Sequence, residues 1–320
     1  MAALHRSVLD AARRALHDGE PGVLALVLET EGSTYVPAGA AAWFGAHAHA
    51  GWLSGGCLET EIAQHAALAC ERSELGWLEL DTRADEDLLD ASSAGCRGRL
   101  RLALLPLAAL PGIDGLLDCW FGEVAAPTLA LHVDGSVQAR FGGRTLDWRL
   151  PVATCGWRSE ARSWALVFAT LPRVAVFGAG PESATLLPLL RRLGARVLLI
   201  ERRDRWAAAA ALADVHLALA PAAALAHPEV AAAGAALVMH HHFEFDREAL
   251  EALAPSSIAF VGLLGPRRRR DDLFRVLPAT ARTSLEPRLH APIGLDLGGF
   301  GAEAIALSTA AQWQAWRHGA

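Results

Sequence analysis

The sequence of 320 residues contains no lysine. Chemistry that depends on a lysine amine is therefore excluded, including Schiff-base formation, pyridoxal phosphate attachment and the lysine of a P-loop. Every basic side chain is an arginine or a histidine, and arginine suits bidentate recognition of phosphate where it clusters. Because alanine is abundant, the missing lysine points to codon bias rather than to selection for arginine chemistry.

Other features that the chain lacks narrow the functional class further. The net charge is −6, so no overall basic field favours nucleic acid or an anionic membrane. No apolar run approaches the roughly 20 residues that a membrane-spanning helix needs. The amphipathic N-terminal segment also lacks the apolar core of a signal peptide, and we therefore expect a cytoplasmic protein.

Cysteine is scarce and irregularly spaced. The five cysteines are odd in number and contain no CxxC pair, which argues against a disulfide framework and against a zinc ribbon. Cys70, Cys119 and Cys155 lie in apolar or unassigned contexts, where a structural role is expected.

The hydrophobic content of 52% is sufficient for two cores, and the predicted fold class is α/β. We expect an α+β domain over residues 1–168 and a Rossmann-like, doubly wound parallel sheet over residues 169–320. In the first domain the pattern predicts an N-terminal helix, strands near 22–30, 40–45, 51–53, 76–82 and 98–105, and a helix over 58–70. Residues 106–168 carry weaker signals: a connection with some helical pattern, then a small antiparallel element with turns at 134–135 and 142–143.

The second half alternates strands and helices. The apolar runs predict buried strands at 174–177, 197–200, 235–239 and 258–264. Helices are expected from 183 to 193, from 246 onwards and near 302–316. The stretch 207–236 is strongly biased towards alanine and gives no clear assignment.

The most informative segment is Ser54-Gly55-Gly56-Cys57-Leu58-Glu59, a glycine turn that leads into a predicted helix. A helix N-terminus leaves backbone N–H groups free to hold an anion. A cysteine placed there experiences the positive end of the helix dipole, which favours a reactive thiolate. The alternative is a tight turn with a structural cysteine. Cys96 lies in a second glycine turn, which raises the hypothesis of two thiols that converge on one ligand.

A second motif, in the C-terminal half, resembles a dinucleotide-binding fingerprint. Gly178 and Gly180 allow a tight turn and close approach of a pyrophosphate, and Ser183 replaces the third glycine. Glu201 ends the next strand, where an acid would bond ribose hydroxyls. Arg202 and Arg203 follow Glu201 directly, so NADP is an alternative to NAD as the expected ligand. The same topology serves many ligands, so nucleotide binding is a hypothesis separate from the fold.

Two further clusters follow predicted strands, at the edge where open α/β sheets bind ligands. In His240-His241-His242, two rings could ligate a metal with Glu244 or Asp246, or the segment could be a polar loop that lines a cleft. The run Arg267 to Arg270 begins a helix and could hold phosphate, or form a solvated basic face beside Asp271 and Asp272.

Several segments together resemble the XdhC/CoxI family, the xanthine dehydrogenase accessory factors of bacteria. The resemblance spans nearly the whole chain, with its motifs in order. The matching segments are Glu31 to Thr34 with Pro37 and Gly39, Ser54 to Glu59, Gly95-Cys96, Val176 to Gly180, Val238-Met239 with His241 and Asp246, Val261 to Gly265 with Arg267-Arg268, and Leu289 to Asp296 leading to Glu303 to Ala306.

The resemblance implies an assembly factor for a molybdenum hydroxylase. Such a protein binds molybdenum cofactor as cargo, protects it while a cysteine desulfurase supports its sulfuration, and delivers it to the client enzyme. A homodimer is the expected assembly. The implied cofactor-binding residues are Ser54, Gly55, Gly56, Cys57, Glu59 and Cys96, with Cys57 as a ligand to molybdenum; the N-terminus at Gly56-Cys57 or the arginines at 267–270 would hold the cofactor's phosphate.

For the C-terminal half, we assign Gly178, Gly180, Ser183 and Glu201 to a nucleotide such as NAD(P), and the remaining cleft candidates are His241, Arg267, Arg268, His290 and Asp296. Some positions depart from the family pattern: Arg97-Gly98 replaces a glycine pair, His240 to His242 replaces Thr-His-Asp, and Leu297 to Gly301 replaces a more acidic segment.

Two other functions remain open. One is a NAD(P)-dependent oxidoreductase with His241 or His290 as acid/base beside the nicotinamide. The other is a non-catalytic scaffold whose Rossmann half serves dimerisation alone.

Overall fold

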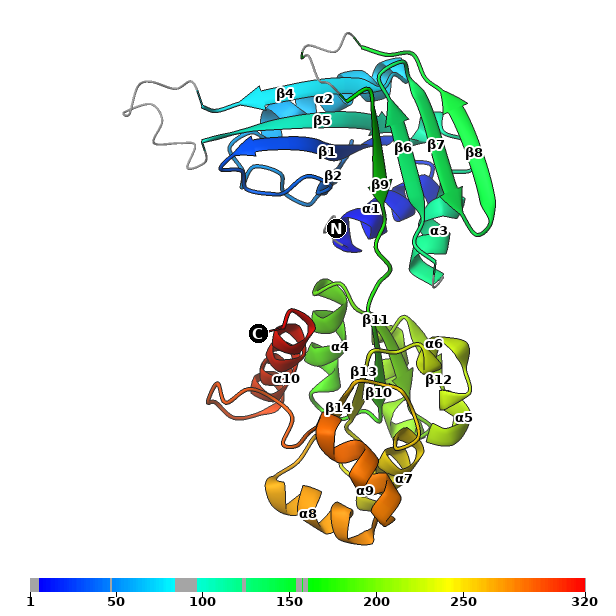
Figure 1. The fold of residues 1–320 in the computed structure, drawn as a ribbon, viewed down its shortest axis with the longest axis vertical. Coiled ribbons are helices and arrows are strands. Elements are labelled where there is room, and N and C mark those ends of the chain that lie inside the picture. Colours follow the sequence, from blue (N-terminus) through cyan, green and yellow to red (C-terminus); the bar gives the residue numbers. More distant parts are fainter. Residues whose placement is uncertain are drawn as a thin grey trace. The chain divides into compact units, whose positions relative to one another are not determined.

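The computed structural model describes residues 6–46, 48–83, 97–122, 125–153, 157 and 161–319. The chain divides into two compact units, residues 1–170 and 171–320. Figure 1 labels their elements. No helix in these described ranges is long and apolar enough to cross a membrane.

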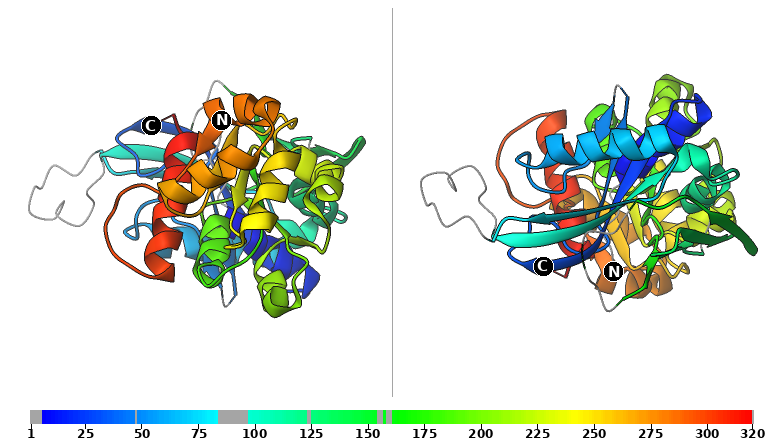
Figure 2. Two further views of the ribbon diagram at one scale, coloured as in Figure 1. Left: turned by 90° about the horizontal axis from the view of Figure 1, so that it is seen from below. Right: turned by 90° about the horizontal axis from the view of Figure 1, so that it is seen from above.

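The N-terminal unit is built on a five-stranded antiparallel sheet with the order β3-β2-β1-β5-β4. Helix α2 lies along one face of this sheet, as the right-hand view of Figure 2 shows. Its apolar residues pack on alternate strand positions such as Val23, Ala25 and Val27. The elements are α1 (Arg6–His17), β1 (Gly22–Gly32), β2 (Ala41–Gly45), β3 (His49–Ala50), α2 (Glu59–Arg72), β4 (Gly76–Asp81) and β5 (Gly98–Pro106).

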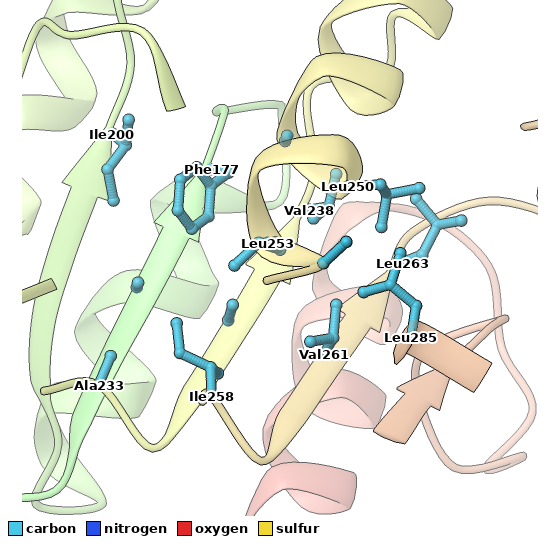
Figure 3. Close-up of a cluster of buried hydrophobic side chains, with 14 of the residues drawn as sticks. Phe177, Ile200, Ala233, Val238, Leu250, Leu253, Ile258, Val261, Leu263 and Leu285 are labelled. Carbon is cyan, nitrogen blue, oxygen red and sulfur yellow. The ribbon is translucent and has the colours of Figure 1, made fainter. Parts of the chain in front are cut away.

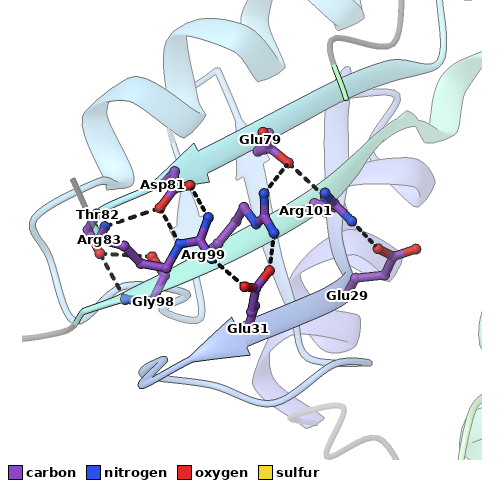
Figure 4. A network of polar contacts seen from close by, with 9 residues as sticks. All are labelled: Glu29, Glu31, Glu79, Asp81, Thr82, Arg83, Gly98, Arg99 and Arg101. Atoms are coloured by element: carbon purple, nitrogen blue, oxygen red, sulfur yellow. Dashed lines mark hydrogen bonds and ion pairs between the residues drawn. The ribbon is translucent and has the colours of Figure 1, made fainter. Parts of the chain in front are cut away.

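A β-bulge in β1 changes the face of the sheet towards which the following side chains point. The register with β5 shifts between Val27 and Glu29, so Val27 faces α2 whereas Glu29 faces the opposite side. There Arg101 lies between Glu29 and Glu79, with nitrogen–oxygen distances of 2.6 and 2.7 Å. Figure 4 shows how this ladder of alternating charges continues through Glu31, Asp81, Arg83 and Arg99.

The small antiparallel element expected in the later part of residues 106–168 is present. Its four strands have the order β8-β7-β6-β9, and Asp134-Gly135 and Gly142-Gly143 lie in the predicted turns. The elements of this part are η2 (Leu107–Ala109), α3 (Asp114–Gly122), β6 (Thr128–His132), β7 (Ser136–Phe141), β8 (Arg144–Arg149) and β9 (Ser163–Val167).

The C-terminal unit has a parallel sheet with the order β12-β11-β10-β13-β14-β15. Numbered from its own first strand, this order is 3-2-1-4-5-6, the Rossmann arrangement, and the predicted fold class is confirmed. The strands are β10 (Arg173–Phe177), β11 (Arg196–Ile200), β12 (Val215–Leu217), β13 (Ala235–Val238), β14 (Phe260–Leu263) and β15 (Leu289–His290). The helices are α4 (Ser183–Arg192), η3 (Asp204–Leu212), α5 (Pro221–Leu225), α6 (Pro228–Ala231), α7 (Phe243–Leu253), α8 (Arg267–Val276), α9 (Ala279–Leu285), η4 (Glu286–Arg288) and α10 (Ala302–Arg317).

Alternate residues of these strands fill two cores, one on each face of the sheet. Val174 and Val176 of β10 pack with α4 and α10. Ala175 and Phe177 pack on the other face, with α5, α7 and α9. Figure 3 shows Phe177 in this second cluster, beside Val238 and Leu253. Continuous apolar runs are required because both faces are buried.

The structure corrects some element boundaries. Residues 51–53 form no strand, and the short β3 lies at His49–Ala50 instead. Helix α7 begins at Phe243, three residues before the predicted start at Asp246. The alanine-rich stretch contains η3, β12, α5 and α6, which alanine alone does not distinguish because it fits both helices and buried strands.

Truncation of Phe177 tests the second core. We expect Phe177→Ala to lower the free energy of unfolding of the C-terminal unit by about 3–5 kcal/mol, because it opens a cavity in a fully buried cluster. Urea denaturation followed by circular dichroism measures this change. The control is Phe300→Ala, which removes a fully exposed ring from the same unit and should change stability by less than about 0.5 kcal/mol. Equal effects of the two substitutions would contradict the described packing.

Candidate functional site

The turn between β3 and α2 is held by the carboxylate of Glu59, which is buried. One of its oxygens accepts the backbone N–H groups of Leu53 and Ser54, both at 2.9 Å, and the other accepts that of Gly56 at 2.8 Å. The Ser54 hydroxyl also bonds this carboxylate and accepts the N–H of Leu58 at 2.9 Å. Gly55 and Gly56 take positive φ angles of 74° and 112°, which other residues rarely adopt.

Three of the N–H groups at the turn where an anion was expected are already bonded, including that of Gly56; binding of an anion there stays a prediction. The N–H groups of Leu53, Ser54 and Gly56 bond Glu59, so the negative charge at this helix N-terminus comes from the chain itself. Burial alone would raise the pKa of Glu59, but its hydrogen bonds with Ser54 and Leu53 outweigh burial and hold that pKa below 4.5.

The thiol of Cys57 is exposed on this turn. Its sulfur lies 3.2 Å from the carbonyl oxygen of Ser54 and donates to it. Two exposed aromatic rings flank the glycines: Tyr35 lies against Gly55, and Trp52 lies beside Gly56. Tyr35 and Trp52 retain 56% and 55% of their accessible surface. Neither ring was predicted as part of a site, although Trp52 precedes the motif by only two residues.

Three separate sequence motifs meet at this turn. A small pocket is lined by Ser33, Thr34 and Tyr35 of one motif, by Ser54 and Cys57 of the second, and by Gly98. The N–H of Ser33 donates to the carbonyl of Arg97 at 3.0 Å. Cys96 lies outside the described residues, but its neighbour Arg97 is placed directly beside the Ser33 loop. The hypothesis of two converging thiols stays a prediction.

In the C-terminal unit, the glycine loop after β10 lies where the strand order reverses, between β10 and β13. Gly178 has a φ of 90°, and a Cβ there would meet the ring of His240 at 2.5 Å. The N–H of Ala179 donates to Glu201 at 2.8 Å, and the N–H of Gly180 donates to the Ser183 hydroxyl at 3.0 Å. These two N–H groups are therefore already bonded within the loop.

Glu201 is buried and bonded to protein groups. Its carboxylate accepts the backbone N–H of Arg203 at 2.8 Å and Nε of the same residue at 2.9 Å. Burial raises the pKa of Glu201, but the hydrogen bonds from Arg203 and Ala179 outweigh it and lower the pKa overall. The Arg203 guanidinium also donates to the carbonyls of Ala179 and His240, at 3.0 and 2.8 Å.

The space above Gly180 is occupied by a carboxylate and an imidazole. A Cβ on Gly180 would meet Oε1 of Glu182 at 2.5 Å and Nε2 of His241 at 2.6 Å. His241 Nε2 lies 3.1 Å from both oxygens of the buried Glu182. This hydrogen bond outweighs burial and raises the pKa of His241 above 6.5. His241 also has a positive φ of 53°, an uncommon conformation for histidine.

Asp246, which follows the histidine run, links the backbone of His240 to the side chain of Arg269 in α8. One of its oxygens accepts the His240 backbone N–H at 3.1 Å, and the other accepts Nε of Arg269 at 3.1 Å. Asp246 is fully buried. Among the described residues, no three His, Cys, Asp or Glu side chains are arranged to hold a metal ion, so the geometry does not support the metal hypothesis for the histidine run.

The remaining predicted cleft residues do not join this cluster. Arg267 and Arg268 are exposed at the start of α8, and Arg268 lies 3.8 Å from Asp272. The ring of His290 stacks on Phe260 at a centroid distance of 4.1 Å, and burial lowers its pKa. Asp296 is exposed on the loop before α10.

Glu59→Gln tests the self-capped turn. We expect a loss of about 1–3 kcal/mol in the free energy of unfolding near neutral pH, because an amide cannot accept all the bonds that the carboxylate accepts. The folded-state pKa is depressed, so this contribution is present above pH 4.5 and is lost as the pH falls through the folded pKa. Urea denaturation at several pH values measures it. Glu61→Gln, an exposed position in the same helical turn, is the control and should be neutral; an equal loss there would refute the assignment.

A second substitution tests the Glu182–His241 pair. Glu182→Gln should lower the pKa of His241 towards 6.5, because the carboxylate stabilises the protonated ring. Since the folded pKa is raised, the pair's contribution to stability is complete below 6.5 and is lost as the pH rises through the folded pKa. An NMR titration measures the midpoint, with His241→Gln to identify the signal. Glu244→Gln, on exposed α7 surface, should leave it unchanged; an unchanged midpoint in Glu182→Gln would contradict the pairing.

Comparisons with known proteins give the family. Residues 4–79 match the XdhC and CoxI family, and residues 174–313 match the XdhC Rossmann domain. A protein of Bacillus subtilis (strain 168), named as a probable xanthine dehydrogenase subunit, is 25% identical over 325 residues, covering 96% of this chain and 95% of that protein. The fold is similar to the crystal structure of a xanthine dehydrogenase from Bacillus halodurans, with a TM-score of 0.75, 21% identity, and coverage of 98% of this chain and 96% of that one. The two family matches together cover more than half of the sequence, and the chain therefore belongs to the XdhC and CoxI family.

Proposed function

We propose that this protein binds molybdenum cofactor as cargo, supports its sulfuration and inserts it into a molybdenum hydroxylase of the xanthine dehydrogenase type. Membership of the family supports an accessory role, as does the similarity to a protein named for xanthine dehydrogenase. The observation that carries the proposal is the exposed Cys57 thiol, on a turn whose two glycines lie against the exposed rings of Tyr35 and Trp52. A cysteine desulfurase and a second copy of the chain are the further partners that we propose.

The chemistry of the turn suits this cargo. A thiolate is a soft ligand and matches a molybdenum–dithiolene centre. The Cys57 sulfur is exposed, and its one described hydrogen bond is to the carbonyl of Ser54, so a ligand can reach it from solvent. The phosphate of the cargo has no free N–H cradle at Leu53, Ser54 and Gly56, because Glu59 accepts those groups. The geometry therefore supports contact through sulfur at this turn rather than through phosphate.

The alternative of a NAD(P)-dependent oxidoreductase receives little support from the glycine loop. The position for a pyrophosphate above Gly180 holds the Glu182 carboxylate, which would repel it. Glu201 bonds Arg203 and Ala179 instead of facing an open ribose site. The residues present do not fit the usual pose of a dinucleotide, and we derive no hydride-transfer step from them.

Removal of the thiol tests the proposed function. The protein is incubated with molybdenum cofactor and desalted, and molybdenum and pterin are quantified. We expect wild type to retain close to one of each per chain and Cys57→Ala to retain at least about ten-fold less, since one soft ligand is lost.

Cys119→Ala is the matched control, because it removes a buried thiol from α3 and should retain cargo like the wild type. Absence of retention in the wild type would contradict cargo binding. Equal retention by wild type and Cys57→Ala would keep the function and make the thiol structural. The oxidoreductase alternative predicts instead saturable NAD(P)H binding that does not depend on Cys57.

A further inference from the structure

A groove of about 910 Å³ lies beside the Cys57 turn, between α2 and the β2–β3 hairpin. Its volume is in the range of small-molecule sites. Gly56 and Glu59 of the turn belong to its lining, so the groove begins one residue from the thiol. The proposed role of Cys57 leaves this groove unexplained.

One wall of the groove is aromatic. The rings of Phe44 and His49 stack at a centroid distance of 4.7 Å with 23° between their planes. Trp52 meets His49 edge-on at 5.1 Å and keeps more than half of its surface exposed. Phe44 is buried behind His49, whereas the exposed rings of His49 and Trp52 offer faces on which a flat ligand stacks.

The opposite wall consists of small side chains on α2. Ala63, Ala66 and Ala67 line the groove there. Ala63 and Ala67 present only methyl groups to this space, whereas Ala66 is buried and packs on the sheet. The groove is therefore shaped for a planar group rather than for a branched chain.

The charges of the lining define the ligand further. Glu71 is exposed at the groove and offers carboxylate oxygens, and Glu59 adds a second negative charge. No arginine belongs to the described lining residues. A phosphate would be repelled, whereas a heterocycle that carries N–H donors on its edge would find an acceptor in Glu71.

We propose that this groove holds the pterin ring system of the molybdenum cofactor, stacked on Trp52 with its amino-pyrimidinone edge towards Glu71. The inference rests on the proposed function and adds to it the part of the protein that recognises the organic half of the cargo. Trp52 then holds the flat ring in the groove. Cys57 follows the lining residue Gly56 but belongs to the neighbouring small pocket, so the metal end of the ligand has to extend past Gly56 to reach the thiol. The phosphate points away from the two carboxylates.

The test uses the full chain and free 6-hydroxymethylpterin, an uncharged probe without metal, dithiolene or phosphate. Equilibrium dialysis with fluorescence detection measures its affinity. Wild type and Cys57→Ala should bind it equally. Trp52→Ala should bind it about ten-fold more weakly, the loss expected for one stacked heterocycle. Ala67→Trp fills the groove from an exposed helix position and should abolish binding.

Leu68→Trp is the matched control, because it adds the same ring to the next, exposed position of α2, outside the groove lining. Circular dichroism checks that both variants fold. Equal probe affinity in wild type and Ala67→Trp, or equal affinity for adenosine and the pterin, would overturn the inference. So would full cofactor retention by Ala67→Trp. Pterin binding that Ala67→Trp abolishes, in a protein that retains no molybdenum cofactor, would instead overturn the proposed function and leave the ring site in place.

Discussion

The carboxylate of Glu59 is the contact on which the N-terminal site depends. It accepts N–H groups from Leu53, Ser54 and Gly56, and so closes a turn whose glycines could otherwise take many conformations. A buried carboxylate in this position fixes the direction in which Cys57 and Trp52 leave the backbone. The turn thus presents a thiol and an aromatic ring to solvent, and the three N–H groups that Glu59 accepts are not available to a ligand.

The same principle recurs in the C-terminal unit. Glu201 and Ser183 bond the N–H groups of Ala179 and Gly180, and Glu182 lies at the start of α4. In both units, acids from the chain itself occupy places where an external anion is usually expected. The accessible groups are the Cys57 thiol and two aromatic rings in the N-terminal unit, and the imidazole of His241 in the C-terminal unit. This contrast favours the N-terminal unit as the place where the proposed molybdenum cofactor would bind.

Much of the fold could be predicted from periodicity, because strands buried on both faces need continuous apolar runs such as 174–177. The glycine motifs likewise marked the two turns correctly. The bonding of the acids was not predictable: Glu59 fits a helix start, but the sequence does not show that its carboxylate turns back over Ser54. Glu182 could have been noticed in the sequence, because an acidic residue inside a phosphate-binding motif would repel the phosphate. The His241 ring bonds Glu182, which lies 59 residues earlier in the chain, and local sequence patterns carry no information about such a distant contact.

The bulge in β1 has a consequence for how this sequence can vary. It lets one strand present apolar residues to α2 at Val27 and an acid to the charged ladder at Glu29. Substitutions along the strand keep this division. Deletion of the extra residue, Leu28, would keep it as well, because Val27 and Glu29 already pair with the consecutive residues Leu102 and Arg101 of β5 and would then alternate regularly. The bulge therefore lets β1 carry one residue more than its partner strand while Glu29 and Glu31 stay on the charged face, and the strand is free to vary in length by that one residue.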